Sequence, residues 1–178
     1  MKIKDNETKI KLAEQQGAAY QDAVDYLKEI VAGYQEQKVD DYIVTVCAEE
    51  AEGLYHLENG ELTWEDPAEG LNAHLEIIIQ DADDKRFIPQ LDVVATLYSE
   101  DQEMVQEKHH PFLWHPFVFH YGANWKIPKE GNYSIEVKIS TPHFHRHDVV
   151  KGKKYPRQVT LHFDKLKMET DRKLHAPE

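Results

Sequence analysis

Cysteine is nearly absent from this sequence, since Cys47 is the only one among 178 residues. A single thiol excludes a disulfide framework, a cysteine-built zinc site and an iron–sulfur cluster within one chain. Cys47 ends the apolar run Ile43–Cys47, a setting typical of a buried and unreactive thiol. The same setting argues against a nucleophilic role.

Positive charge is also scarce. The 21 basic residues stand against 33 acidic ones and give a net charge of -12. No long basic stripe occurs, so we predict no nucleic-acid partner. An acidic surface repels phosphates and concentrates cations near the protein.

Long apolar runs and common catalytic motifs are missing as well. No segment approaches the ~18 apolar residues that a membrane-spanning helix needs. The beginning, Met1–Glu7, lacks the apolar core of a secretion signal, which predicts a cytoplasmic protein unless a leader has been removed. No P-loop, G-x-S-x-G, G-x-G-x-x-G or H-E-x-x-H motif occurs, so those classes of nucleotide-binding protein and hydrolase are unsupported.

The N-terminal part predicts a helix from about Asn6 to Gly33. Its apolar residues recur at intervals of three and four and form one stripe: Tyr20, Val24, Leu27, Val31 and Tyr34. The stripe must pack on the domain that follows or on the same helix of a second copy.

From Asp41 onward the apolar residues follow the period of two that is typical of strands. We predict six to eight short strands without interleaved helices, which favours an antiparallel β-sandwich. The clearest segments are Tyr42–Ala48, Leu54–Leu57, Leu62–Trp64, His74–Gln80, Leu91–Tyr98, Tyr133–Ile139 and Val159–Phe163. Asn59 and Gly60 indicate a tight hairpin turn. We divide the chain into a helical extension (1–36), a β-domain (37–167) and a charged tail (168–178).

Histidine is abundant, and seven of the eleven histidines fall between positions 109 and 147. Imidazole nitrogens beside a carboxylate suit divalent transition-metal ions. The triplet His74-Leu75-Glu76 places its histidine and carboxylate on one face of a strand. Leu75, Ile77 and Ile79 then point into the core. The alternative is an exposed polar face that pairs with a neighbouring strand.

A second histidine group, His143, His145 and His147, follows Pro142. An extended backbone there puts all three imidazoles on one side. The alternative is a loop of solvated histidines. His143 and His145 could then line the route by which an ion enters.

A third group, His115 and His120, lies in an aromatic stretch interrupted by Pro116 and Gly122. We expect an irregular backbone at the edge of the core or around a shielded pocket. A histidine held in such a place needs a metal or a hydrogen-bonding partner. The alternative is a structural histidine bonded to a backbone carbonyl.

The segments H-L-E, F-I-P-x-L-D-V, H-P-F-x-x-H-Y-G-x-N-W-K, a Gly-Tyr strand and P-x-x-x-R-H-D follow one another along the chain. In this order they resemble the periplasmic metal-binding proteins of bacterial high-affinity ferrous-iron uptake, also known as copper-binding iron-transport lipoproteins. The resemblance covers roughly His74 to Phe163 and leaves out the N-terminal helix.

The resemblance implies an all-β, immunoglobulin-like sandwich, here with an added helix, that forms a homodimer and binds copper or a similar ion near the dimer interface. It implies a site of three histidines and a glutamate: His74, Glu76, His120 and His147. A methionine of the family site is replaced by Phe117, and loss of its sulfur should weaken a preference for Cu(I). His115, two residues earlier, is a candidate nitrogen ligand in its place.

We therefore predict a non-enzymatic protein that binds copper or ferrous iron, with zinc or manganese as further candidates. It would serve iron or copper acquisition, with a membrane iron permease as partner and a periplasmic or cell-envelope location. Two other functions stay open. One is a metal-dependent enzyme, for which no general base is apparent, and the other is a metal-free interaction module on the same fold.

Overall fold

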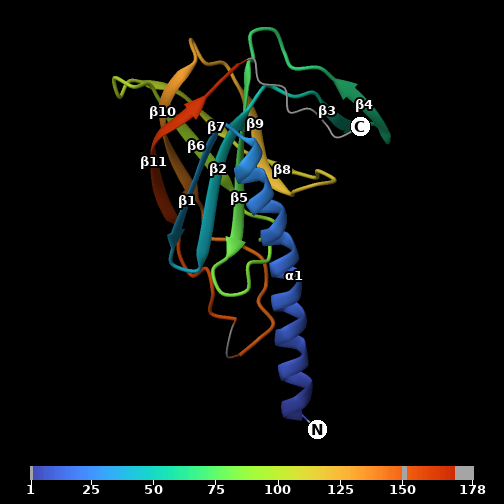
Figure 1. Cartoon of the computed structure of the whole chain (residues 1–178). Helices are drawn as coiled ribbons and strands as arrows, with labels where there is room; N and C mark the ends of the chain where they lie inside the picture. The colour runs from blue at the N-terminus through green and yellow to red at the C-terminus, as the bar shows by residue number, and fades with distance from the viewer. Residues whose placement is uncertain (1, 150–151, 171–178) are drawn as a thin grey trace.

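Two antiparallel sheets pack face to face in the computed structural model, which describes residues 2–149 and 152–170 (Figure 1). The five-stranded sheet has the order β1 (Gly33–Val39), β2 (Tyr42–Glu49), β5 (Ala73–Asp81), β9 (His120–Trp125), β8 (Phe112–Leu113). The four-stranded sheet has the order β11 (Val159–Met168), β10 (Gly131–Ile139), β6 (Val93–Tyr98), β7 (Met104–His109). The predicted β-sandwich is confirmed.

The core lies between the sheets and follows the alternation read from the sequence. Leu75, Ile77 and Ile79 of β5 are fully buried in it, as predicted. Trp125 of β9 and Phe163 of β11 are buried in the same cluster. The intervening residues of β5 must then point to the outer face of the five-stranded sheet.

Four strands escaped prediction: β1, β7, β8 and β9. Strand β1 is mostly polar and partly exposed, so it shows no apolar alternation. The irregular backbone expected in the aromatic stretch is present at residues 114–119, around Pro116. It is absent at Gly122, which lies in strand β9 and pairs with Glu76 in the sheet. Strand β11 runs to Met168, the first residue of the predicted charged tail, and Met168 is fully buried.

Helix α1 (Lys2–Ile30) ends three residues before the predicted Gly33. Tyr34 belongs to β1, since Gly33 already pairs with Ala48 of β2. The division at residue 36 stays a prediction, and β1 begins three residues before it.

The outer face of the five-stranded sheet is covered by the C-terminal half of α1, while its N-terminal half projects beyond the sandwich (Figure 1). Val24 and Leu27 of the helix pack in one buried cluster with Cys47, Ile78 and Val118. The helical stripe therefore packs on the sheet of its own chain. Among the described residues, no helix has the length and apolar character needed to cross a membrane.

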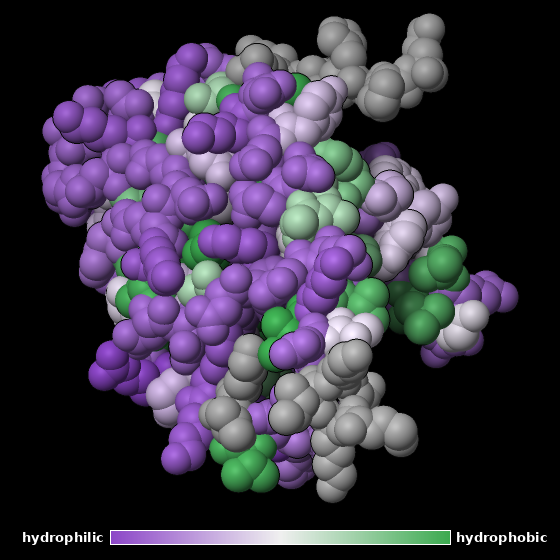
Figure 2. Space-filling view, turned by 60° about the horizontal axis from the view of Figure 1, so that its bottom comes forward, coloured by the Kyte–Doolittle hydropathy of each residue, from purple (hydrophilic) through white to green (hydrophobic). Residues whose placement is uncertain are grey.

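A separate hairpin of β3 (Leu54–Glu58) and β4 (Glu61–Glu65) stands at one side of the sandwich (Figure 1). Its turn residues Asn59 and Gly60 have φ values of 51° and 88°. Both lie in the left-handed region that a two-residue hairpin turn requires, so the predicted turn is confirmed. The face of the molecule in Figure 2 is mostly hydrophilic, with small separate hydrophobic areas.

The long loop between β10 and β11 is fastened at one end of β5. Arg146 donates hydrogen bonds to backbone carbonyls of the same loop, including that of Tyr155 at 3.0 Å. The Tyr155 hydroxyl donates to Asp81, the last residue of β5. This loop carries His147, so the position of that histidine follows from the attachment at Asp81.

Candidate metal centre

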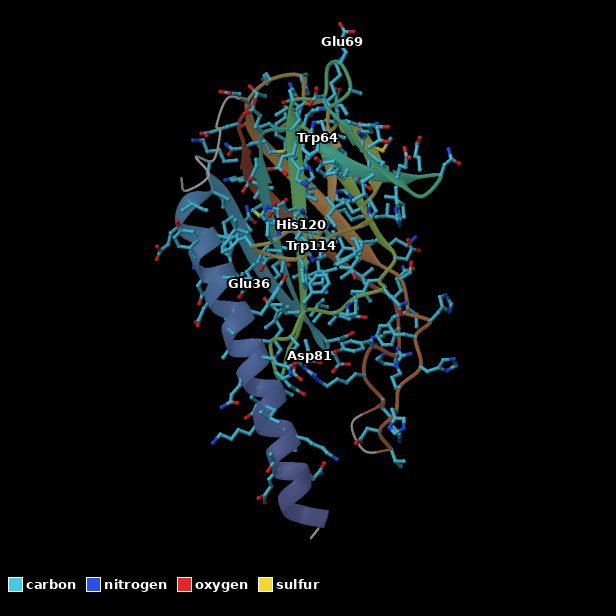
Figure 3. The ribbon with its side chains drawn as sticks, turned by 90° about the vertical axis from the view of Figure 1, so that its right-hand side faces the viewer. Glu36, Trp64, Glu69, Asp81, Trp114 and His120 are labelled. Carbon is cyan, nitrogen blue, oxygen red and sulfur yellow. The ribbon has the colours of Figure 1, made fainter. Side chains whose placement is uncertain are left out.

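Three of the predicted ligands converge on the outer face of the five-stranded sheet: His74, Glu76 and His120. One ligand atom from each lies within 4.8 Å of the others. The side chains are buried, with relative exposures of 0%, 6% and 2%. Strand β5 supplies the histidine and glutamate on one face, as the alternation predicts, and the first residue of β9 supplies the other histidine. Figure 3 shows His120 in the middle of the sandwich, near the helix.

Both imidazoles are oriented by a hydrogen bond on Nδ1. His74 Nδ1 lies 2.8 Å from Asn124 Oδ1, and His120 Nδ1 lies 3.1 Å from the Val118 carbonyl oxygen. A carbonyl oxygen can only accept, so each Nδ1 carries the ring proton and donates it. Each Nε2 is left with its lone pair, and both Nε2 atoms are buried without a partner. Buried polar atoms of this kind need a partner, and a metal ion that accepts both lone pairs would supply one.

Asn124 is a site residue that sequence reasoning did not assign. Its Oδ1 also accepts from the Glu52 backbone N–H at 3.1 Å, and its Nδ2 donates to the Glu52 carbonyl at 2.7 Å. These two bonds fix which way the amide points, so Oδ1 faces His74. No spacing rule distinguishes such an asparagine. Only its register position opposite His74 reveals it.

The space in front of the imidazoles depends on Gly122. A Cβ atom at this position would lie 2.6 Å from His74 Nε2 and 2.9 Å from His120 Cδ2. Real Cβ atoms do not approach other heavy atoms that closely, so no other residue fits without moving the rings. Gly122 therefore gives the two histidines the room in which their nitrogens face one centre.

Glu76 completes the cluster with one carboxylate oxygen. Its Oε1 lies 3.7 Å from His120 Nε2, while its Oε2 accepts a hydrogen bond from the Cys47 thiol at 3.3 Å. Burial raises the pKa of Glu76, although the His74 imidazole and the Cys47 hydrogen bond oppose this shift. An additional carboxyl group, Glu49, lies opposite His74 in the sheet register, and burial together with Glu76 raises its pKa to about 8.

The histidines of the cluster are neutral at pH 7. Burial lowers the pKa of His74, and it lowers the pKa of His120 to about 4. A neutral imidazole is the form that binds a metal ion, so neither ring has to lose a proton first. The residues present thus fit a divalent transition-metal ion: two imidazole nitrogens, one carboxylate oxygen and a shielded space between them.

Comparison with known proteins assigns the chain to a family. The sequence model of a family described as Fe2+ transport protein matches residues 27–169. The chain belongs to this family. The predicted resemblance is confirmed. The match leaves out most of helix α1, as expected. A search of the curated proteins finds no match.

Solved structures support the fold. FetP of uropathogenic Escherichia coli strain F11 aligns with a TM-score of 0.61 at 23% identity, over 76% of this chain and 93% of FetP. A copper-bound variant of FetP aligns with a TM-score of 0.63 at 21% identity, over 83% and 98%. Copper-reconstituted P19 of Campylobacter jejuni aligns with a TM-score of 0.64 at 19% identity, over 80% and 98%.

His115 does not belong to the cluster that contains His74 and His120. Its ring centroid lies 6.2 Å from that of His120. Its Nδ1 accepts from the backbone N–H groups of Phe117 and Val118, at 3.1 and 3.4 Å. A neutral ring that accepts at Nδ1 carries its proton on Nε2. His115 can bind a metal only after those contacts break.

Phe117, the residue expected to replace a methionine of the family site, packs edge-on against Tyr26 of helix α1, with ring centroids 5.8 Å apart. The helix thus contacts this residue directly. A phenyl ring has no lone pair to offer, so Phe117 cannot act as a ligand.

His147 is exposed and does not join the cluster. Its loop is attached at Asp81, five residues along β5 from Glu76, which corresponds to roughly 17 Å of strand. Figure 3 shows Asp81 well below His120, toward the end of the sandwich where this loop lies. His143 and His145, on the same loop, are also exposed.

A histidine outside the cluster makes the fold sensitive to acid. His110 is fully buried, its Nε2 accepts from Trp125 Nε1 at 3.3 Å, and burial lowers its pKa to about 3. The unfolded chain takes up this proton near pH 6.5, so stability falls as pH drops from there toward 3. Between pH 7 and 4.5 we expect His110 to cost about 2 to 3 kcal/mol of unfolding free energy.

Denaturant titrations at the two pH values check this expectation, with His110→Gln as the comparison. The substituted protein should lose that much less stability on acidification. An equal loss of stability in both proteins would show that His110 is not the source of the acid sensitivity.

Proposed function

We propose that this chain binds a divalent transition-metal ion, copper or ferrous iron, through His74, Glu76 and His120, and serves iron or copper acquisition. The observation that carries the proposal is the pair of buried, unpartnered Nε2 atoms gathered with a carboxylate oxygen within 4.8 Å. Family membership and the copper-bound relatives support it.

The donor set favours Cu(II), Fe(II), Zn(II) or Mn(II) over Cu(I). Imidazole nitrogens and a carboxylate oxygen suit these borderline and hard ions, whereas Cu(I) prefers sulfur. Phe117 removes the sulfur that the family site uses. The ion is cargo in this proposal, so capture and release are the function and no chemical conversion is required.

We further propose that His147 acts in a homodimer, where the loop of one copy reaches the centre of the other. Its attachment to the Asp81 end of β5 keeps His147 away from the cluster of its own chain. A membrane iron permease as the recipient and a periplasmic or cell-envelope location are part of the same proposal, which rests on membership of an Fe2+ transport family.

Metal titration of untagged protein tests the proposal. We expect one copper, ferrous or zinc ion per chain at pH 7.5, removable by a chelator. Affinity should be weaker at pH 5, because protons compete for Glu76, whose pKa lies above its ordinary value. The loss should reach at most about tenfold per pH unit for this single proton.

The control is the triple variant His74→Ala, Glu76→Gln, His120→Ala, which retains the exposed histidines. Its affinity measures how weakly the exposed histidines bind metal without the cluster. The proposal fails if this variant binds as tightly as the unsubstituted protein, or if affinity is equal at both pH values.

A further inference from the structure

The single thiol of the chain lies directly against the proposed ligand Glu76. Cys47 of β2 and Glu76 of β5 are register partners, and the Cys47 sulfur lies 3.3 Å from Glu76 Oε2. Both side chains are buried, Cys47 completely. A carboxylate that binds a metal accepts hydrogen bonds, so the thiol is the donor.

The sheet geometry decides whether this sulfur can reach the ion itself. The imidazole nitrogens face the space above Gly122 of β9, on one side of β5. Cys47 lies on β2, on the other side of β5. Two strand spacings separate Cys47 from Gly122, roughly 10 Å. A metal–sulfur bond is about 2.3 Å long. Glu76 therefore stands between the sulfur and the centre.

We propose that Cys47 is the positioning residue of Glu76. This inference rests on the proposed function. The thiol holds Oε2 by its hydrogen bond, and this fixes the carboxylate so that Oε1 faces His120 Nε2, 3.7 Å away. Metal-binding carboxylates and histidines are commonly oriented by such outer hydrogen bonds. Asn124 does the same for His74, so two of the three proposed ligands are held by a side chain of their own sheet.

Helix α1 shields the hydrogen bond between Cys47 and Glu76 from water, so that the thiol, although a weak donor, can orient the carboxylate. Val24 and Leu27 pack over Cys47 in one buried cluster. Water would otherwise bind Oε2 more strongly than a thiol does, because S–H is a weak donor. With water excluded, the thiol is the side-chain donor that Oε2 has among the described residues. The helix, which lies mostly outside the family match, thereby contributes to the geometry of the centre.

Two substitutions of Cys47 separate positioning from packing. Cys47→Ala removes the donor and should weaken zinc affinity about 10- to 100-fold, the usual effect of losing an outer hydrogen bond to a ligand. Cys47→Ser restores a donor and should recover most of that loss. Ile78→Val, a change in the same buried cluster without a bond to Glu76, should leave affinity within about threefold. Thermal unfolding of each variant shows whether it is folded.

The infrared S–H stretching band gives a second readout, since only one thiol contributes to it. In metal-free protein, Glu76→Gln should shift this band, because the acceptor changes. In the zinc-loaded protein the band should persist, because the thiol keeps its proton. Disappearance of the band on zinc loading would show sulfur bound to the ion and overturn the inference.

The remaining outcomes are also decisive. If Cys47→Ala loses no more affinity than Ile78→Val, or if Cys47→Ser loses as much as Cys47→Ala, the positioning role is wrong while metal binding stands. If the unsubstituted protein binds no zinc, copper or ferrous ion, the proposed function falls and this inference falls with it.

Discussion

Gly122→Ala is expected to weaken metal binding about 100-fold or more while removing no ligand. The new Cβ would lie 2.6 Å from His74 Nε2 and 2.7 Å from a Leu113 methyl carbon. The obstructed atoms are side-chain ends, which can move, so the fold should survive while the imidazoles leave their places. The loss therefore comes from geometry rather than from chemistry.

Equilibrium competition with a chelator of known affinity measures this effect. Ala123→Gly is the control, because it changes one methyl group on the opposite side of the same strand. It should leave affinity nearly unchanged. An alanine at position 122 that binds metal as tightly as glycine would mean that the centre lies elsewhere.

The second large effect is expected when His120→Ala is compared with His115→Ala. His120 offers a free, buried Nε2, so its loss should cost more than about 100-fold in affinity, beyond what an outer hydrogen bond contributes. His115 has its Nδ1 occupied by two backbone N–H groups. Its loss should lower metal affinity less than about fivefold, a smaller effect than the removal of a residue that hydrogen-bonds to a ligand.

The same comparison tests the prediction that His115 takes the place of the methionine implied by the family resemblance. If His115→Ala is as damaging as His120→Ala, then His115 has left its backbone contacts and acts as a nitrogen ligand. If it is not, the centre works with fewer ligands from one chain. Affinity, copper stoichiometry and the copper electron paramagnetic resonance spectrum, which counts nitrogen ligands, distinguish the two results.

Alternation along single strands predicted much of the sandwich and two of the three clustered ligands. His74 and Glu76 share a face because strand side chains alternate, and that rule needs no knowledge of the partner strands. His120 could be linked to them through the family resemblance, although the strand that begins with it was not expected. Gly122 concealed this strand because glycine usually interrupts one.

The features that escaped prediction depend on register between distant segments. Asn124 meets His74, and Cys47 meets Glu76, only because three strands pair in particular registers. No local pattern in the sequence contains that information. Helix α1 was predicted as an amphipathic helix. The sequence did not reveal that it packs on the sheet of its own chain and not on the helix of a second copy.

The histidine clusters were a partial guide for a physical reason. A buried imidazole without a hydrogen-bond partner lowers the stability of the fold, whereas an exposed imidazole forms its hydrogen bonds with water. His143, His145 and His147 are exposed, so density alone did not distinguish them from the buried pair. The distinguishing quantity is burial together with a free nitrogen, which depends on the three-dimensional structure.

Crystals grown with copper, measured at the copper absorption edge, test the central claim most directly. We expect one anomalous peak per chain, about 2 Å from His74 Nε2, His120 Nε2 and a Glu76 oxygen. Copper found only at the exposed histidines of the loop between β10 and β11, with no peak at these three residues, would contradict it.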